Sequence, residues 1–487
     1  MSSLGVKGAR GALIGTFGQF IKLGVNIASL VVLARLLSPH DYGLIAMVTA
    51  VIGVAEIIRD MGLSAASIQA KHLTSIERSN LWWANTAIGL FCALGTAILA
   101  PVLVAFYNEP AVLYITLALS TTFLFNGATT QFRASLVREL RVKPIAYSDI
   151  SASLIAFFVA LYCALTGAGY WALVLQQILG ACLSFVFIAF SAGWCPQAYN
   201  SSVSIKPYLK YGLPLFGSGV LTYAASNLDV TLIGRFYGTT LLGQYNRAMQ
   251  LIRMPMNQIR SPLGSMALST LSKVQDDNQR LVEFAGKAQL IFLYPITLLG
   301  MYAAATAAET VPFVLGSRWA EIAPLVAIFA IGDSISNLSS AGGWLYLAKG
   351  RSGTLFKYTL LSALVRITLF VFMVPFGFMA IASVYIIAPM ILWPISFYIC
   401  ARTTRINTLP LFLTSLRVII LAGFALGASW SAKSFFDFRG SPLLTLTITS
   451  LIYIAIPLLL LMVIPRYRKD FMVCLKTLKS ILGRSKQ

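Results

Sequence analysis

Three arginines lie in an apolar stretch of the chain, which is a costly place for a permanent positive charge. The stretch runs from Gly243 to Thr270 and contains Arg247, Arg253 and Arg260. An arginine near the centre of a bilayer costs about 2.5–3.5 kcal/mol, so such residues turn towards a cavity, a counter-charge or a ligand. On a helix, Arg253 and Arg260 are two turns apart and share one face. The spacing predicts a cationic wall that binds an anion inside a membrane.

Neutral polar residues extend this pattern to a second stretch. Gln250 and Asn257 follow the arginine stripe, and Gln19 and Asn26 flank Lys22 in the first apolar stretch. At a rise of about 1.5 Å per residue, Lys22 lies roughly 17 Å from the inner end of its stretch, near the middle of the hydrocarbon layer. The two stripes are therefore predicted to line one polar cavity.

Four carboxylates share the apolar stretches and offer alternative partners. Because buried charges usually pair, Glu56 or Asp60 could neutralise Arg260 and join helices without any ligand. Intramembrane carboxylates can also relay protons, so these two residues, Asp229 and Asp333 are candidates for coupling to a proton or sodium gradient. The basic residues assigned to the stretches are Lys22, Arg247, Arg253, Arg260, Arg366 and Arg417. They outnumber the four carboxylates, so part of the cationic wall is predicted to lack a protein partner.

Composition places these residues in a polytopic membrane protein. Hydrophobic residues make up 58% of the 487 residues, charged residues 11%, and the mean hydropathy is +0.79. The net charge of +21 is spread over the connections between apolar stretches rather than gathered in one patch, which argues against nucleic-acid binding. We therefore predict an all-α membrane protein.

Fourteen apolar stretches are long enough to span a bilayer. They cover residues 11–36, 42–65, 81–106, 111–136, 147–166, 170–193, 211–236, 243–270, 284–308, 321–348, 355–375, 378–401, 409–431 and 442–464. Basic residues concentrate in both tails and in the even-numbered connections, so both termini are predicted to be cytoplasmic. The odd-numbered connections hold Arg35, Arg235, Arg318, Lys433 and Arg439.

The chain also divides into two similar halves. At an offset of 200 residues, Arg35 meets Arg235 and Gly43 meets Gly243. Two six-helix lobes with a site between them near the midplane are the expected transporter architecture. The predicted boundaries are 1–193 for the N-lobe, 194–210 for a cytoplasmic linker, 211–401 for the C-lobe, 402–465 for two extra spans and 466–487 for a basic amphipathic tail. The apolar face of the tail, which favours an interfacial helix on anionic lipid, comprises Phe471, Met472, Leu475, Leu478 and Leu482.

Several motifs carry a resemblance to one family of membrane proteins. Residues 35–43 read RLLSPHDYG, residues 60–64 read DMGLS, and residues 311–319 read VPFVLGSRW, followed by APL at 323–325. With the fourteen-span plan, they resemble the polysaccharide transporter family of the multidrug/oligosaccharidyl-lipid/polysaccharide exporter superfamily, in particular its Wzx-type and colanic-acid-exporter-like members.

This resemblance implies a flippase of the bacterial inner membrane. Such a protein moves a polyprenyl-diphosphate-linked oligosaccharide between leaflets by alternating access, for exopolysaccharide or O-antigen-type lipopolysaccharide synthesis. It implies that Lys22 and Arg253 bind the diphosphate and that the last two spans form a groove for the polyprenyl tail. The spacing of the arginine stripe adds Arg260 to the expected diphosphate ligands. A polysaccharide polymerase and a chain-length regulator are the expected protein partners. The residues expected to line the polar cavity for the sugars are Gln19, Asn26, Gln250 and Asn257.

No enzymatic step is expected. The chain has no GxxxxGK[ST] phosphate loop and no HExxH pair, and neither His40 nor His72 lies in a ligand cluster, so we predict no cofactor and no metal. Three alternatives remain open. A small-anion carrier would also use a cationic midplane, whereas a multidrug exporter would have to admit organic cations that such a cavity repels. A membrane glycan polymerase or ligase would bind the same lipid, but the short outward connections leave it no extramembrane domain.

Overall fold

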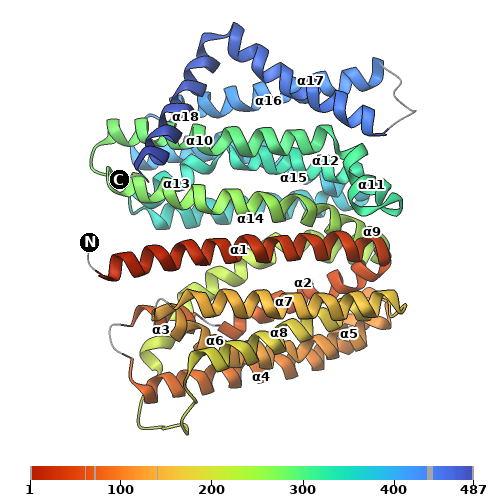
Figure 1. Ribbon diagram of the computed structural model, residues 1–487, viewed down its shortest axis with the longest axis vertical. Helices are drawn as coiled ribbons and strands as arrows, with labels where there is room; N and C mark the ends of the chain where they lie inside the picture. Colours follow the sequence, from red (N-terminus) through yellow and green to blue (C-terminus); the bar gives the residue numbers. More distant parts are fainter. Residues whose placement is uncertain (1–2, 61, 71–72, 140, 436–441, 485–487) are drawn as a thin grey trace. The chain divides into compact units, whose positions relative to one another are not determined.

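The protein is built almost entirely of helices. The computed structural model describes residues 3–60, 62–70, 73–139, 141–435 and 442–484 (Figure 1). Eleven helices in this part are long and apolar enough to cross a membrane. The prediction of an all-α, multi-pass membrane protein is confirmed. Met61 of the DMGLS motif, Arg439, and the side chains of Leu478 and Leu482 lie outside the described residues.

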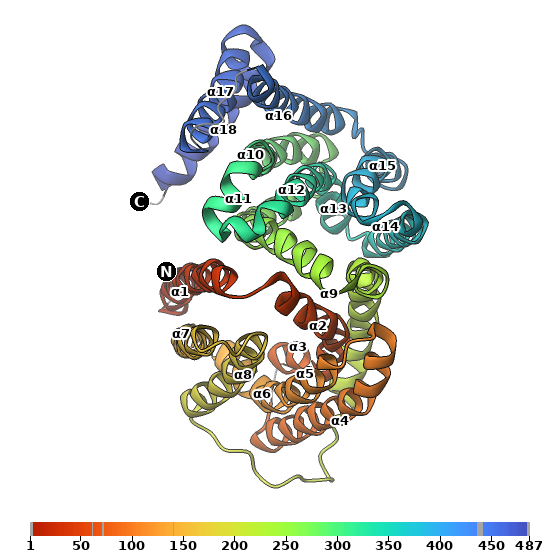
Figure 2. The same cartoon turned by 90° about the vertical axis from the view of Figure 1, so that its right-hand side faces the viewer.

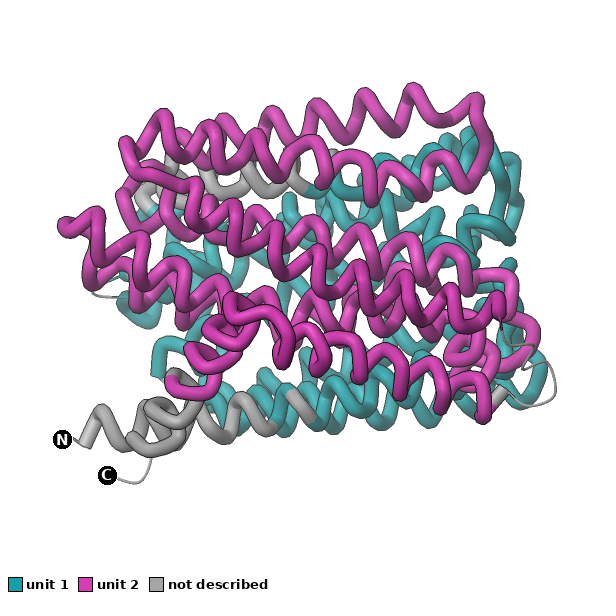
Figure 3. Tube along the Cα trace, turned by 90° about the horizontal axis from the view of Figure 1, so that it is seen from above, with its two compact units in different colours: residues 1–246 teal, residues 247–487 magenta. Residues whose placement is uncertain are grey.

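The chain forms two compact units, Met1–Asn246 and Arg247–Gln487 (Figure 3). The first unit begins with α1 (Ser3–Leu36), α2 (Pro39–Asp60), α3 (Leu63–Gln69) and α4 (Ser75–Tyr107). It continues with α5 (Ala111–Ser120), α6 (Thr122–Arg138), α7 (Val142–Leu165), α8 (Trp171–Ala192) and the first part of α9 (Lys206–Ser272).

The second unit contains the end of α9 and all later helices. These are α10 (Asn278–Ala305), α11 (Ala307–Leu315), the 3-10 helix η1 (Ser317–Ile322), α12 (Ala323–Asn337), α13 (Ser340–Ala348) and α14 (Ser352–Met373). They are followed by η2 (Val374–Phe376), α15 (Phe378–Thr404), α16 (Leu409–Phe435), α17 (Pro442–Val463) and α18 (Pro465–Arg484).

Local sequence signals fix where helices begin and end. Thr74 caps α4 by accepting a hydrogen bond from the backbone N–H of Glu77, whose carboxylate accepts from the Thr74 N–H in return. The same helix ends at Asn108, which adopts the left-handed conformation with φ 56°. Pro110 then directs the chain into α5.

Small residues bring the helices of the first unit close together. Ala152, Ala156, Ala160 and Ala164 recur every fourth residue on α7, and all four are buried. α7 packs against both α1 and α8, which lie beside it in Figure 1 and Figure 2. A Cβ atom at Gly18 of α1 would lie 2.7 Å from the Cβ of Ala146. Without side-chain bulk between them, backbones approach closely, as is common in membrane helix pairs.

Two glycines mark the closest backbone crossing in the first unit. α9 consists of two helical parts separated by Gly238, whose φ of 83° requires a residue without a Cβ. Just after this break, a Cβ at Gly243 would lie 1.8 Å from the carbonyl oxygen of Pro39, and a Cβ at Gly43 would lie 1.8 Å from that of Thr239. The crossing is reciprocal: each glycine approaches a carbonyl four residues before the other glycine. The contact between Gly43 and Thr239 therefore corresponds to the contact between Gly243 and Pro39 at the offset of 200 residues.

The second unit has a core built around α10. Leu281, Ala285 and Leu293 of this helix are fully buried. The ring of Phe292 meets Trp344 of α13 edge-on, with centroids 5.0 Å apart. α10 also packs against α12 and α16, while α18 lies against α10 and α17. Arg417 ties α16 to α18 through Asp470, at 3.2 Å from Nε to Oδ2. The tail therefore forms a helix, and an ion pair joins it to the unit.

Candidate anion-binding site

Lys22 belongs to a three-residue charge cluster in the first unit. Its Nζ lies 3.2 Å from Oδ2 of Asp149 on α7. Arg133 of α6 binds the same carboxylate with both terminal nitrogens, one to each oxygen. Asp149 is largely buried, with 15% of its side chain exposed, whereas Lys22 and Arg133 are 41% and 38% exposed. Two cations thus share one carboxylate, and the cluster keeps a net charge of about +1 with both cations accessible.

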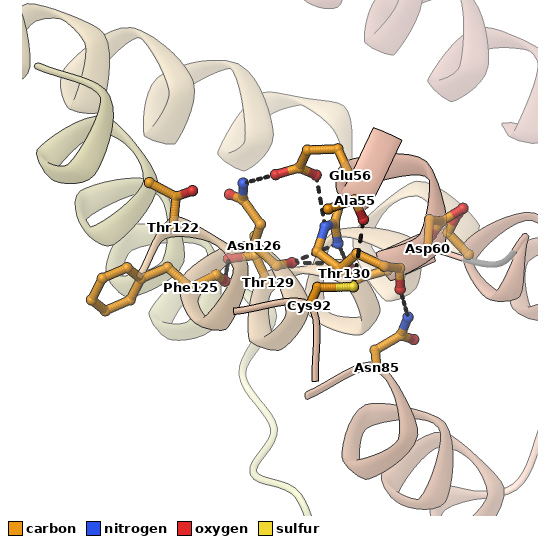
Figure 4. A network of polar contacts seen from close by, with 12 residues as sticks. Ala55, Glu56, Asp60, Asn85, Cys92, Thr122, Phe125, Asn126, Thr129 and Thr130 are labelled. Carbon is orange, nitrogen blue, oxygen red and sulfur yellow. Dashed lines mark hydrogen bonds and ion pairs between the residues drawn. The ribbon is translucent and has the colours of Figure 1, made fainter. Parts of the chain in front are cut away.

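Glu56 lies in a separate polar network (Figure 4). Its Oε2 accepts from Nε of Arg59 at 2.8 Å, and its Oε1 accepts from Nδ2 of Asn126 on α6 at 2.7 Å. Arg59 also donates to the carbonyl of Asn126 at 3.0 Å and to the hydroxyl of Thr130. The carboxylate of Glu56 neutralises Arg59, and the contacts of both side chains with Asn126 and Thr130 join α2 to α6.

Two further predicted carboxylates accept hydroxyl hydrogen bonds. Asp60 accepts from Ser64 of α3 at 2.8 Å. Asp229 of α9 is fully buried and accepts from the Tyr245 hydroxyl at 2.6 Å. Both hydrogen bonds join residues close in the chain, four positions apart for Asp60 and sixteen for Asp229.

Arg260 forms an ion pair in the second unit. Its NH2 group lies 2.6 Å and 2.7 Å from the two oxygens of Asp333 on α12. Asn337 donates a further hydrogen bond to Asp333 Oδ2 at 3.2 Å. Within the described residues, Nε of Arg260 is buried and has no hydrogen-bond partner. The sequence correctly suggested that Arg260 pairs with a carboxylate, but the partner here is Asp333 of its own unit rather than Glu56 or Asp60.

Arg253 lies against an aromatic side chain. Its NH2 group donates to the hydroxyl of Tyr385 on α15 at 3.1 Å, and its guanidinium carbon lies 5.4 Å from the centre of that ring. The ring is held by Phe329 and Phe370, whose centroids lie 5.1 Å and 6.0 Å away. This packing fixes the ring that orients Arg253.

The remaining predicted residues are distributed along the same helices. Gln250 accepts from Arg247 at 3.1 Å. Gln19 and Asn257 are exposed, and Asn26 is half-buried. Arg366 lies on α14 and, among the described residues, has neither a hydrogen bond nor an ion pair. No three His, Cys, Asp or Glu side chains gather as metal ligands in the part of the chain that the structure describes.

Sequence reasoning missed three charged residues of these clusters. Arg59, Arg133 and Asp149 were left out of the intramembrane charges, yet they lie in helices α2, α6 and α7, inside candidate spans. The count of six basic residues and four carboxylates was therefore wrong. Arg59 could have been found, because it follows Glu56 by three residues and so shares its face. The link between Lys22 and Asp149 joins residues 127 positions apart, and no local spacing indicates it.

Comparison with known proteins identifies the family. A sequence model described as "Polysaccharide biosynthesis protein" matches residues 32–324, which is more than half of the chain. The chain belongs to this polysaccharide biosynthesis family. The resemblance to polysaccharide transporters is thereby confirmed.

Relatives within and beyond this family agree with the assignment. The chain is 26% identical over 365 residues to the lipopolysaccharide biosynthesis protein WzxC of Escherichia coli K12, covering 73% of each protein. It is 24% identical to the succinoglycan biosynthesis transport protein ExoT of Rhizobium meliloti, covering 70% of this chain and 69% of that one. Among solved structures, the lipid II flippase MurJ in an inward closed conformation superposes with a TM-score of 0.73 at 13% identity, covering 92% of this chain and 99% of that chain. An inward-facing multidrug transporter of the MATE family gives a TM-score of 0.59 at 11% identity, covering 84% and 96%. This polysaccharide biosynthesis family member therefore has the fold of these transporters.

Proposed function

We propose that this protein is a flippase of the bacterial inner membrane that moves a polyprenyl-diphosphate-linked oligosaccharide to the outer leaflet by alternating access. The observation that carries the proposal is a surplus of positive charge inside the membrane: Lys22 and Arg133 share a single carboxylate and both remain accessible. A diphosphate cannot cross hydrocarbon unless its water is replaced by fixed donors. Arginine supplies a planar fork for phosphate oxygens, and lysine supplies a point charge.

The remaining site residues take roles that follow from their chemistry. Lys22, Arg253 and Arg260 bind the diphosphate during its passage. The prenyl tail stays in lipid, beside the last two spans, and no covalent bond is broken. The amide side chains that offer donors and acceptors to sugar hydroxyls are Gln19, Asn26, Gln250 and Asn257.

Ion coupling is proposed to act through intramembrane carboxylates. Asp333 is the sharpest candidate, since it holds Arg260 with both oxygens. Protonation of Asp333 would release the arginine to a phosphate, which is how a carboxylate can link proton uptake to anion binding. Glu56, Asp60 and Asp229 are the other candidates. A gradient of protons or sodium ions would then bias the direction of transport.

The proposed topology has fourteen spans with both termini in the cytoplasm. It is supported by adding α1 and the two parts of α9 on either side of Gly238 to the eleven candidate spans. The lobes would be 1–193 and 211–401, joined by 194–210 and followed by 402–465. A polymerase and a chain-length regulator would meet the product on the outer side.

Native cysteines allow this orientation to be tested. Cys195 is exposed in the connection between α8 and α9, whereas Cys92 and Cys400 are buried. Cys474 on the tail helix is the unreactive control for labelling on the same side of the membrane. Burial raises the pKa of its thiol to about 11, which leaves little of the reactive thiolate at neutral pH. An impermeant maleimide should label Cys195 in inverted vesicles and not in intact spheroplasts. Labelling in spheroplasts alone would place this connection outside.

The function itself is tested by leaflet sidedness in proteoliposomes. The probe is a fluorescent polyprenyl-diphosphate oligosaccharide, and the readout is its accessibility to an impermeant lectin. Wild type should flip the lipid, and Lys22→Ala and Arg253→Ala should each slow flipping. Lys287→Ala is the control, because Lys287 lies on the exposed surface of α10. No flipping by a folded wild type would overturn the proposal and favour a small-anion carrier, whereas lengthened glycan chains would indicate a polymerase.

A further inference from the structure

Asp149 differs from Glu56 and Asp333 in the number of its ion-pair partners, because it pairs with two cations. Lys22 reaches it from α1, and Arg133 reaches it from α6 with a two-pronged contact. Neither cation has another hydrogen-bond or ion-pair partner among the described residues. Glu56 and Asp333, in contrast, each face a single arginine. The positive charge around Asp149 is therefore only half compensated.

The cluster is also accessible. Lys22 and Arg133 expose 41% and 38% of their side chains, while Asp149 exposes 15%. The carboxylate thus lies behind two cations that can be reached from outside the helix packing. A ligand that approached them would meet ammonium and guanidinium groups first.

In the proposed topology, Arg133 and Asp149 lie in the cytoplasmic halves of their helices. Arg133 is five residues from the end of α6, and Asp149 is seven residues from the start of α7. At about 1.5 Å per residue, both lie roughly 8–10 Å from the ends of their helices. In the proposed topology these ends face the cytoplasm, where the lipid-linked substrate is made. The cluster is then among the first cationic groups that the head group meets.

Carboxylate and diphosphate compete for the same donors. A guanidinium binds two oxygens of a carboxylate or of a phosphate with the same fork geometry. A diphosphate carries more oxygens and more negative charge than one carboxylate, so it can satisfy both cations at once. It can therefore replace Asp149, and Asp149 can take the cations back when the lipid leaves.

We propose that Asp149 is an internal counter-ion that occupies a diphosphate-binding site formed by Lys22 and Arg133, and that it is displaced by the arriving substrate. The inference rests on the proposed function and adds two residues to it, Arg133 as a ligand and Asp149 as a competitor. Asp149 keeps the two cations together when the site is empty. It also weakens the bound state enough to permit release.

Binding of farnesyl diphosphate to the full-length protein in neutral nanodiscs tests this role. Asp149→Asn keeps the shape and removes the competing charge, so it should bind the probe about tenfold more tightly than wild type, as expected for one released ion pair. Its flipping rate should fall, because the substrate leaves more slowly. Lys22→Ala combined with Arg133→Ala should abolish the gain. An unchanged or weaker affinity of folded Asp149→Asn would overturn the proposal.

A measurement on wild type covers the case in which Asp149→Asn does not fold. Farnesyl diphosphate should increase carbodiimide modification of Asp149 and decrease acylation of Lys22, because the carboxylate is displaced while the amine is covered. Protection of both residues, or no change at Asp149, would contradict displacement. Farnesol is the matched control, since it has the chain without the phosphates.

The two proposals fail in distinguishable ways. If wild type flips the lipid and Asp149→Asn binds the probe and flips the lipid equally well, only the counter-ion role is overturned. A wild type that binds farnesyl diphosphate with displacement of Asp149 but flips no lipid would overturn the flippase function alone. A wild type that neither binds the probe nor flips the lipid would overturn both.

Discussion

Asp149 of the first unit and Asp333 of the second hold different numbers of cations. In the first unit, Asp149 faces two cations, Lys22 and Arg133. In the second unit, Asp333 faces one arginine, Arg260, and is supported by the amide of Asn337. A one-to-one pair is neutral and joins helices, whereas a two-to-one cluster keeps charge for a ligand. The ratio of cations to carboxylates therefore separates cations that carry uncompensated charge at rest, Lys22 and Arg133, from Arg260, which must first be released from Asp333.

The strongest test of this distinction removes Asp333, the carboxylate of the one-to-one pair. Asp333→Leu leaves Arg260 without its ion-pair partner inside the membrane and should lower the free energy of unfolding by about 3 kcal/mol, as is typical for a broken buried pair. Thermal unfolding in detergent measures this loss. The double variant Arg260→Met with Asp333→Leu should recover most of it, and no recovery would mean that Asp333 stabilises the unit in another way.

A functional cation should affect transport more than folding. Arg253→Ala removes a charge-assisted donor to phosphate and should reduce the flipping rate by about 30-fold, equivalent to about 2 kcal/mol. The unfolding temperature should change little, because the guanidinium is half-buried against a ring. Equal flipping by wild type and a folded Arg253→Ala would make this arginine structural.

Arg366 and Arg59 form a matched pair for separating compensated from uncompensated charge. Arg366→Leu removes a cation that has neither a hydrogen bond nor an ion pair among the described residues, and should raise the free energy of unfolding by about 1–2 kcal/mol. Arg59→Leu removes the partner of Glu56 and should lower it by a similar amount. Chemical unfolding of both variants measures whether the free energy of unfolding rises or falls relative to wild type. A change in the same direction for both variants would contradict the distinction between compensated and uncompensated arginines.

The smallest expected effect concerns the ring below Arg253. Tyr385→Phe keeps the cation–π contact and removes the hydroxyl, which accepts from Arg253 at 3.1 Å and donates to Sδ of Met249 at 3.8 Å. We expect a two- to threefold reduction of flipping, from the loss of about 0.5 kcal/mol. Tyr385→Leu, which also removes the ring, should be worse. Identical rates for these two variants would show that the aromatic face does not orient the arginine.

Helices were more predictable from the sequence than their charged contacts. The apolar run at 81–106 predicted the span α4, Ser75–Tyr107, within one residue at its end and six residues at its start, because an apolar run is a local signal. The predicted break between residues 236 and 243 coincides with Gly238. Partners such as Asp149 for Lys22, or Tyr385 for Arg253, come from helices more than 120 residues away. Only packing decides which face of one helix meets which face of another, so these contacts could not be predicted.

The reciprocal crossing at Gly43 and Gly243 has a mechanical consequence for α2. Atoms at a point where two backbones touch move least in any rotation of the helix about that point. Arg59 lies sixteen residues along α2 from Gly43, or about 24 Å at 1.5 Å per residue. A rotation of about 10° around the crossing would carry this end of the helix by roughly 4 Å, more than the length of a hydrogen bond. The two glycines therefore lie at the pivot of such a rotation, and Glu56 and Arg59 lie at the end of α2 that would move most.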